Sequence, residues 1–191
     1  RWNEGEEQGK KNVVKLLNPL GEETSVMRTS LIPNMLEVIS MNAARKNEFF
    51  AGFEFGNIFY LEQSEPLEQK SFVASVYGKE EDFFPLKGRI EGILNGLRYQ
   101  PRVYLPNKEH PTFHPGRCAD IFIGEEKVGI LGEVHPKVAS AFNIKKKVYL
   151  CELNIPTLMS LFDNTMKYCQ IPKFPAMKRD IALVVDKNQY V

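Results

Sequence analysis

The stretch HPGRCADIFIGEEKVGILGEVHP, residues 114–136, decides how this chain folds. Two apolar runs within it, CADIFI at 118–123 and KVGILGEV at 127–134, have the length and composition of strands. Gly124, Glu125 and Glu126 separate these runs, and so short a connection containing a glycine is typical of a hairpin. We therefore predict an antiparallel hairpin here, followed by a brief helix that begins near Pro136.

The segments on either side of this hairpin show strand and helix patterns in turn. Alternation with period two over 53–61 predicts a long, largely buried strand, and SFVASVYG at 71–78 predicts a second one. Helical spacing predicts a helix after Ser30, which can cap it, and another over 84–97 with Gly96 as its left-handed cap. Shorter elements are expected as a strand ending at Asn18-Pro19, a strand around Val103, a strand over 145–155 and a helix over 156–162.

Strands joined mostly by hairpins, with helices inserted singly, favour an α+β fold over a doubly wound parallel sheet. We predict a core domain over residues 1–170, built on an antiparallel sheet flanked by helices. Two closely spaced prolines after it are typical of a linker. Residues 171–191 are therefore predicted to hold this linker and the first strand of a truncated second unit. A chain that starts at Arg1 and stops in mid-strand is expected to be a piece of a longer polypeptide.

Composition and charge exclude several classes of protein. Of the 191 residues, 43% are hydrophobic and 26% are charged, as in an ordinary globular domain. The 25 basic and 24 acidic residues leave a net charge of +1, too small to create a global field for nucleic acid or a membrane surface. Because no apolar run could span a bilayer and no signal peptide opens the chain, we expect a cytoplasmic protein with no membrane partner.

The cysteines and histidines offer little chemistry. Cys118, Cys151 and Cys169 form no CxxC pair, which argues against a disulfide framework and a zinc site and fits a reducing compartment. His110 and His114 have the spacing of two ligands on one helix, but a proline follows each of them and disfavours a helix there. No serine lies in a G-x-S-x-G elbow. These patterns predict neither a metal site nor a catalytic nucleophile.

Gly129 and Gly132 lie in the second predicted strand of the hairpin. A glycine in a strand weakens it, and so marks a bulge or the close approach of a ligand or another backbone. Two interpretations stay open at this point, a ligand pocket that has lost its function and simple packing. The sequence contains neither of the common glycine-rich phosphate-binding loops.

A series of motifs resembles one known family. The motifs are NPLGEETSVMRTSLIPNML, FEFGNIF, LKGRIEGIL, HPGRCADI and VGILGEVHP. In this order and spacing they resemble the class II synthetase-like core module of the bacterial phenylalanyl-tRNA synthetase beta subunit. FPAMKRDIALVV resembles the opening of the ferredoxin-like anticodon-binding domain that follows this module, and the resemblance covers residues 10–191.

The resemblance implies a function that the residues alone do not. In this family two alpha and two beta subunits form a heterotetramer, and the alpha subunit uses ATP and magnesium to activate phenylalanine and charge tRNA(Phe). The beta core shares the class II fold but is non-catalytic. The chain is thus expected to be a scaffold that contacts the alpha subunit and meets tRNA only through the whole assembly. No catalytic residue, cofactor or metal is expected on this segment itself.

The presence or absence of cations tests catalytic competence independently, because adenylyl transfer needs positive groups that face the triphosphate. Class II sites supply arginines from two sheet segments. In the segment that resembles the first, Phe53–Tyr60, there is Glu54 and no arginine, and in the second, 148–154, there are Cys151 and Glu152. Since removal of one preorganised donor costs about 100- to 1000-fold in rate, we predict negligible adenylation.

We expect the hairpin to retain a vestigial pocket, in which ion pairing has replaced acid-base catalysis. Its residues are Arg117, Gly129, Gly132, Glu133 and His135. The helix after Ser30 and the phenylalanine-rich strand over 53–61 are expected to provide core and inter-subunit packing.

Two other functions stay open. One is an RNA-binding module that uses Lys145–Lys147 and Lys178-Arg179, which the near-zero net charge disfavours. The other is a stand-alone enzyme acting on a small-molecule acid. Its cluster would consist of His114, Arg117, Asp120, Glu133 and His135.

Overall fold

The computed structural model describes residues 13–99, 102–162, 173–174, 177–182 and 184. Helices and strands alternate through the first two of these ranges. In chain order they are the short 3-10 helix η3 (Glu22–Thr24), α1 (Ile32–Ala44), β1 (Phe50–Glu62), β2 (Glu65–Tyr77), α2 (Phe83–Gly96), β3 (Arg102–Pro106), β4 (Phe113–Ile123), β5 (Glu126–Val134), α3 (Pro136–Ala141), β6 (Tyr149–Asn154) and α4 (Ile155–Ser160).

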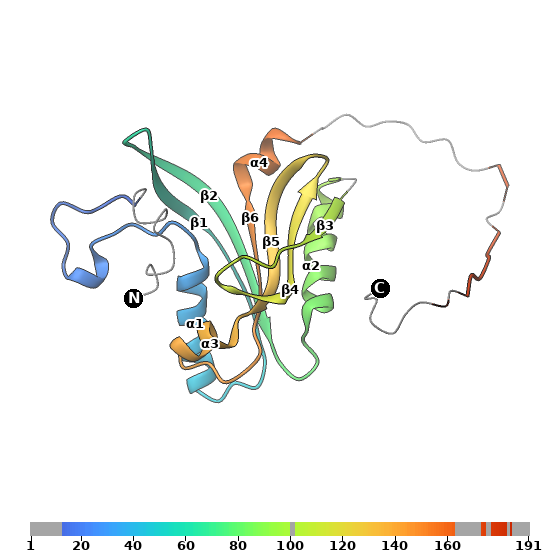
Figure 1. Cartoon of the computed structure of the whole chain (residues 1–191), viewed down its shortest axis with the longest axis horizontal. Helices are drawn as coiled ribbons and strands as arrows, with labels where there is room; N and C mark the ends of the chain where they lie inside the picture. Colours follow the sequence, from blue (N-terminus) through green and yellow to red (C-terminus); the bar gives the residue numbers. More distant parts are fainter. Residues whose placement is uncertain (1–12, 100–101, 163–172, 175–176, 183, 185–191) are drawn as a thin grey trace.

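The strands form one six-stranded sheet in the order β1-β2-β6-β5-β4-β3, and every neighbouring pair is antiparallel. Two hairpins, β1-β2 and β4-β5, lie on either side of β6, the last strand in the chain. Figure 1 shows α1 and α3 on one face of this sheet and α2 on the other. The predicted α+β fold, an antiparallel sheet flanked by helices, is therefore confirmed.

The hairpin predicted within residues 114–136 is confirmed as β4 and β5. Gly124 and Glu125 form the turn, and Gly124 has a φ of 61°, in the left-handed region that glycine adopts at least cost. The register changes from Ile121 opposite Gly129 to Phe122 opposite Lys127, which leaves one extra residue between them in β5. The helix predicted near Pro136 is also present as α3.

Three local predictions were wrong. The strand expected before Asn18 is only an isolated bridge between Lys15 and Val26, because this segment folds back on itself and joins no sheet. Gly96 lies inside α2, and it is Arg98 that has the left-handed φ of 62°. The strand predicted over 145–155 begins only at Tyr149, so the lysines at 145–147 precede it.

The prediction that the strand over 53–61 is largely buried was also wrong. Phe53 and Phe55 are 76% and 56% exposed. The physical reason is that β1 is an edge strand and that its side chains alternate between the face beneath α1 and the opposite face. Ile58 packs into the core on the first face, whereas Phe53 and Phe55 point to the other.

The predicted domain boundary at 170 and 171 lies outside the described residues. Residues 173–174, 177–182 and 184 belong to no helix or strand. The strand predicted there includes residues that are not described, so it stays a prediction. Within the described ranges, the helices are all too short or too polar to cross a membrane.

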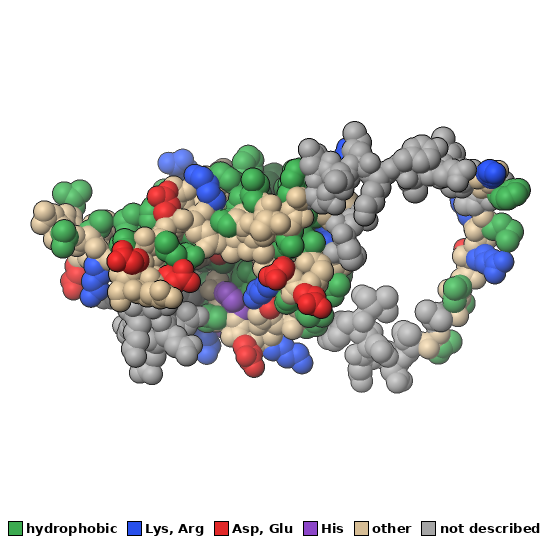
Figure 2. All heavy atoms as spheres, turned by 90° about the horizontal axis from the view of Figure 1, so that it is seen from above, with side chains coloured by type: hydrophobic (Ala, Val, Ile, Leu, Met, Phe, Trp, Pro, Cys, Tyr) green, Lys and Arg blue, Asp and Glu red, His purple; other side chains and the backbone are tan. Residues whose placement is uncertain are grey.

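The surface carries charges of both signs. On the face in Figure 2, the side chains of Lys and Arg are interspersed with those of Asp and Glu. This mixture agrees with the net charge of +1 and leaves no extended basic surface on that face.

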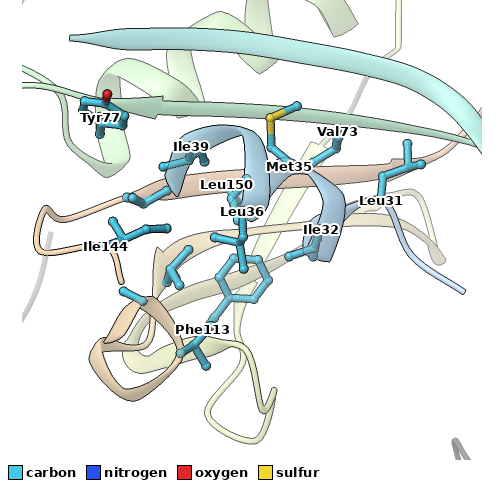
Figure 3. Packing of buried hydrophobic residues seen from close by; sticks show 14 of the residues in the cluster. Leu31, Ile32, Met35, Leu36, Ile39, Val73, Tyr77, Phe113, Ile144 and Leu150 are labelled. Atoms are coloured by element: carbon cyan, nitrogen blue, oxygen red, sulfur yellow. The ribbon is translucent and has the colours of Figure 1, made fainter. Parts of the chain in front are cut away.

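The sheet separates two hydrophobic cores. On one face, Leu31, Leu36 and Ile39 from the α1 segment pack against Phe113 and Leu150 of the sheet (Figure 3). The spacing of the α1 residues is the helical spacing seen in the sequence, so the prediction that this helix provides core is confirmed. The other core lies beneath α2 and α4, and it consists of Val76, Leu86, Ile90, Leu94, Tyr99, Ile121, Ile123, Val128, Leu131, Tyr149, Cys151, Leu153 and Leu158.

Candidate functional site

The carboxylate of Glu152, on β6, binds the beginning of α1. Its oxygens accept hydrogen bonds from the Leu31 amide at 2.8 Å and from the Ser30 hydroxyl at 2.9 Å. The Ser71 hydroxyl of β2 donates a third bond at 3.1 Å, and Ser71 is only 2% exposed. Ser30 also accepts a bond from the Ile32 amide, as the predicted cap should. A strand residue far away in sequence therefore fixes the first turn of the helix.

The carboxylate of Glu54, on β1, contacts the same end of α1. It accepts a hydrogen bond from Nη1 of Arg28 at 2.7 Å, and Nε of Arg28 donates to the Asn57 carbonyl at 2.8 Å. A Cβ atom at Gly56 would lie 2.5 Å from Nη2 of Arg28, so this glycine leaves room for the guanidinium group. Arg28 is the positively charged side chain at this end of α1. Its hydrogen-bond acceptors, the Glu54 carboxylate and the Asn57 carbonyl, belong to the protein itself.

These two strands contain the segments that resemble the two arginine-bearing sheet segments of class II synthetases. In place of such arginines the α1 face holds two carboxylates, Glu54 and Glu152, which are engaged with the protein's own donors. A triphosphate approaching them would meet negative charge and no uncommitted guanidinium from β1 or β6. The chemistry of this donor set does not fit ATP. In the described part of the chain, no cluster of His, Cys, Asp and Glu could hold a metal ion either.

Arg117 and Glu133, two residues of the predicted vestigial pocket, form an ion pair. Nη1 of Arg117 lies 2.8 Å from both carboxylate oxygens of Glu133, which is 3% exposed. Burial, and then the charge of Glu133, raise the pKa of Tyr149 to about 12, which keeps this phenol neutral. The pair therefore neutralises a buried carboxylate next to a buried phenol.

Replacing Arg117 with methionine is expected to lower the free energy of unfolding by about 1–2 kcal/mol, because it leaves a buried carboxylate without its counter-charge. The cost stays below that of a fully buried pair because the Arg117 side chain is 49% exposed, and water screens the charge. Urea unfolding at neutral pH measures this loss. Arg117→Lys, which keeps the charge, should recover part of it, and an unchanged stability in Arg117→Met would contradict the ion-pair role.

Gly129 and Gly132 lie against protein atoms. A Cβ at Gly129 would come within 2.4 Å of the Glu152 carbonyl oxygen and 3.2 Å of the Leu153 Cα. A Cβ at Gly132 would come within 3.0 Å of the Arg117 carbonyl oxygen and 2.9 Å of the Phe113 ring. Of the two interpretations left open by the sequence, this geometry supports close packing.

The residues of the alternative enzyme cluster do not converge. His114 and His135 stack with their ring centroids 6.2 Å apart, and each Nδ1 accepts a backbone amide, of Gly116 and Lys137 respectively. His135 thereby caps α3. Asp120 instead binds Lys127 at 2.8 Å and the side-chain amide of Asn107. Within the described residues these side chains serve local structure, and the predicted five-residue cluster is not assembled.

The thiols are buried. Burial raises the pKa of Cys118 to about 12 and also raises that of Cys151. Both cysteines are free and lie inside the two cores. They are packing residues, and Cys169 lies outside the described residues.

The lysines of the alternative RNA-binding module are partly engaged. Nζ of Lys146 donates to the Asn47 carbonyl at 2.7 Å and lies 4.8 Å from the Tyr77 ring centroid. Lys178 and Arg179 are exposed.

The sequence reasoning missed the network around Glu152. Glu152 was noted only as a residue standing where an arginine was sought, and Ser71 was not considered. The available signal was a glutamate within the run VYLCELN at 148–154 and a serine at the start of the predicted strand over 71–78, since buried polar side chains need partners. Which partners they find depends on β6 lying next to β2, a pairing over about 80 residues that local pattern does not reveal.

The sequence matches the family described as the phenylalanyl tRNA synthetase beta chain CLM domain over residues 1–155. The chain belongs to this beta-subunit family. Relatives named phenylalanine–tRNA ligase beta subunit include those of Clostridium tetani, at 41% identity over 95% of this chain, and of Bacillus subtilis, at 35% over 89%. The chain spans about a quarter of the length of these relatives, 23% in each case.

A solved structure supports the fold of this family member. The chain is similar to the pyrrolysyl tRNA synthetase PylSc of Desulfitobacterium hafniense, with a TM-score of 0.64, over 81% of this chain and 55% of that one. The sequence identity is 15%, so this likeness concerns the fold alone. It confirms that the beta-subunit segment has the fold of an aminoacyl-tRNA synthetase.

Proposed function

We propose that this domain is a non-catalytic scaffold of a phenylalanine–tRNA ligase, which supports the charging of tRNA(Phe) by the alpha subunit. The observation that carries the proposal is the pairing of Glu54 and Glu152 with the start of α1. Where an adenylating enzyme needs cations, this domain uses carboxylates to hold its own helix.

The surrounding assembly belongs to the same proposal. ATP and magnesium act at the alpha subunit, and this segment holds no cofactor of its own. The domain joins an alpha2beta2 heterotetramer in the cytoplasm and meets tRNA through the whole assembly. The segment over 171–191 leads into an anticodon-binding domain. The names of the relatives, all beta subunits, support a partner subunit.

The 191-residue protein is expected to form a complex with the alpha subunit and to bind neither ATP nor phenylalanine. Co-sedimentation in the analytical ultracentrifuge measures the first property, and isothermal titration calorimetry measures the second. Because the α1 face presents carboxylates, ATP should give no saturable heat up to a concentration of about 1 mM.

The alpha subunit alone, titrated with ATP and phenylalanine, is the positive control for calorimetry. Saturable ATP binding by the 191-residue protein at micromolar concentration would reject the non-catalytic part of the proposal. Absence of any complex with the alpha subunit, for this protein and for a full-length beta subunit alike, would reject the scaffold part.

A further inference from the structure

One half of one sheet face is uncovered in the described structure. On the α1 side, the helix packs against both β1 and β2. On the other side, α2 packs over β6 and β5 and α4 contacts β2 and β5, whereas Phe53 and Phe55 of β1 stay exposed. Because a sheet buries each apolar face beneath another layer, an open half-face of this kind needs a further element.

The open half-face has the composition of a buried surface. Phe53 and Phe55 project from it with 76% and 56% of their surface exposed, and the Phe53 ring stacks on Phe72 with centroids 6.0 Å apart. Ile93, on the adjacent side of α2, is 42% exposed. Between them lies a hollow of about 190 Å³ with an almost entirely apolar lining. We name this surface the β1-α2 groove, and its lining includes Ala51, Phe53, Phe72, Ala74, Ile93 and the charged Arg89.

Among the described residues, the sheet edge beside this groove is bonded to Arg28 at Asn57 and Phe59 and is open over residues 50–55, whereas the opposite edge is protected. β3, at the far edge, is five residues long and contains Arg102 and Pro106, which discourage pairing with another strand. β1 is 13 residues long and contains no proline or lysine, and its Glu54 is engaged with Arg28. Natural proteins leave a long apolar edge strand without prolines or lysines mainly where another element covers it. The groove and the edge therefore indicate one covered surface.

We propose that an amphipathic helix from the part of the beta-subunit polypeptide outside these 191 residues lies in the β1-α2 groove. A helix fits this place because it would lie beside α2 at the usual interhelical distance of about 8–10 Å and cover the same sheet layer. Its apolar face would pack on Phe53 and Phe72, and its polar face would point to solvent.

The length of the relatives favours the same polypeptide over another molecule as the source of this helix. Most of the length of each relative lies outside the matched segment, since the chain spans 23% of it. A tethered segment reaches the groove at an effective concentration of roughly millimolar, above that of a free partner in most cells. The groove is then already covered when the subunit meets its partner, and the alpha subunit contacts a different surface.

The experiment compares the reactivity of a cysteine in the groove in two proteins. Phe53→Cys is introduced into the 191-residue protein and into the full-length beta subunit that contains these residues, with Cys169→Ser in both. Cys118 and Cys151 are buried with raised pKa values, so a maleimide reports on position 53 in the native state. Leu105→Cys, on β3 at the other edge and 49% exposed, is the matched control.

The thiol at position 53 should react at least about tenfold more slowly in the full-length subunit alone than in the 191-residue protein, because a covered thiol reacts only when the cover opens. The thiol at position 105 should react equally in both.

Equal rates at position 53, with protection appearing only after the alpha subunit is added, would overturn the proposal and assign the groove to the inter-subunit contact expected for this strand. Protection that rises with the concentration of the 191-residue protein would overturn it in favour of a second copy. Neither result depends on whether the scaffold role is correct, which the co-sedimentation experiment tests separately.

Discussion

Replacing Gly129 with alanine is expected to lower the free energy of unfolding by about 3 kcal/mol, at the upper end of the usual cost of overpacking. The new Cβ would lie 2.4 Å from the Glu152 carbonyl oxygen and 2.6 Å from Cδ2 of Leu153. The oxygen belongs to the backbone of β6, the central strand, so it cannot move without disturbing the β5-β6 ladder. Guanidinium unfolding of the 191-residue protein, followed by circular dichroism, measures the loss.

Gly88→Ala is the matched control for this substitution. Gly88 lies inside α2, and an added Cβ meets nothing within 4 Å. Alanine there should raise the free energy of unfolding by about 0.5–1 kcal/mol, because glycine is a poor helix former. If Gly129→Ala behaved like Gly88→Ala, the close contact with β6 would not exist in solution.

The same substitution decides between the two interpretations of the hairpin glycines. A glycine kept for the approach of a ligand should tolerate a methyl group in the free protein and lose only binding. A glycine kept for packing should lose stability with no ligand present. The contact with the Glu152 carbonyl predicts the second result, because the space above Gly129 already contains β6.

The parts of the fold that local pattern determines could be predicted from the sequence. The turn at Gly124 and the first turn of α3 after His135 depend on residues close together in the chain, and both were placed correctly. The apolar stripe of α1 likewise follows from spacing alone. The resemblance to synthetase motifs then supplied the family, which these patterns alone would not have named.

The parts that depend on long-range pairing could not be predicted. The exposure of Phe53 was missed because alternation shows that a strand has two faces but not whether each face is covered. The five-residue enzyme cluster was proposed from proximity in sequence, yet Asp120 points to Asn107 and Lys127 instead. The pair Arg117 and Glu133 also depends on the extra residue in β5, because the register of the turn alone would place Arg117 opposite Gly132.

The Glu152 network explains why a carboxylate is found on the central strand, at a place where adenylyl transfer would need cations. The helix α1 begins at Ile32, and the preceding Leu31 amide donates to Glu152 instead of to a local cap. Negative charge at the start of a helix is stabilising, because the helix dipole is positive there. The carboxylate thus joins α1 to β6 and β2, and with them it holds together the core on the α1 face.

Glu152→Ala is expected to lower the free energy of unfolding by about 3–5 kcal/mol, since it removes the carboxylate that accepts from three donors in a partly buried place, and only the Ser71 hydroxyl keeps a second acceptor, the Leu153 carbonyl. The donors are the Leu31 amide and the hydroxyls of Ser30 and Ser71. Urea unfolding measures the total loss. Hydrogen exchange should show the first turn of α1 opening before the rest of the domain, because that turn loses the acceptor that β6 supplies.

Glu152→Gln separates the roles of charge and of hydrogen bonding. The amide keeps one acceptor oxygen for the Leu31 amide, so about half of the loss should be recovered if hydrogen bonding dominates. Glu126→Ala, at the exposed start of β5, should change stability by less than about 0.5 kcal/mol and controls for the removal of a glutamate as such. Full stability in Glu152→Ala would show that α1 is held by its apolar face alone. The carboxylate would then need another explanation, because that result excludes a structural role in place of ATP-binding cations.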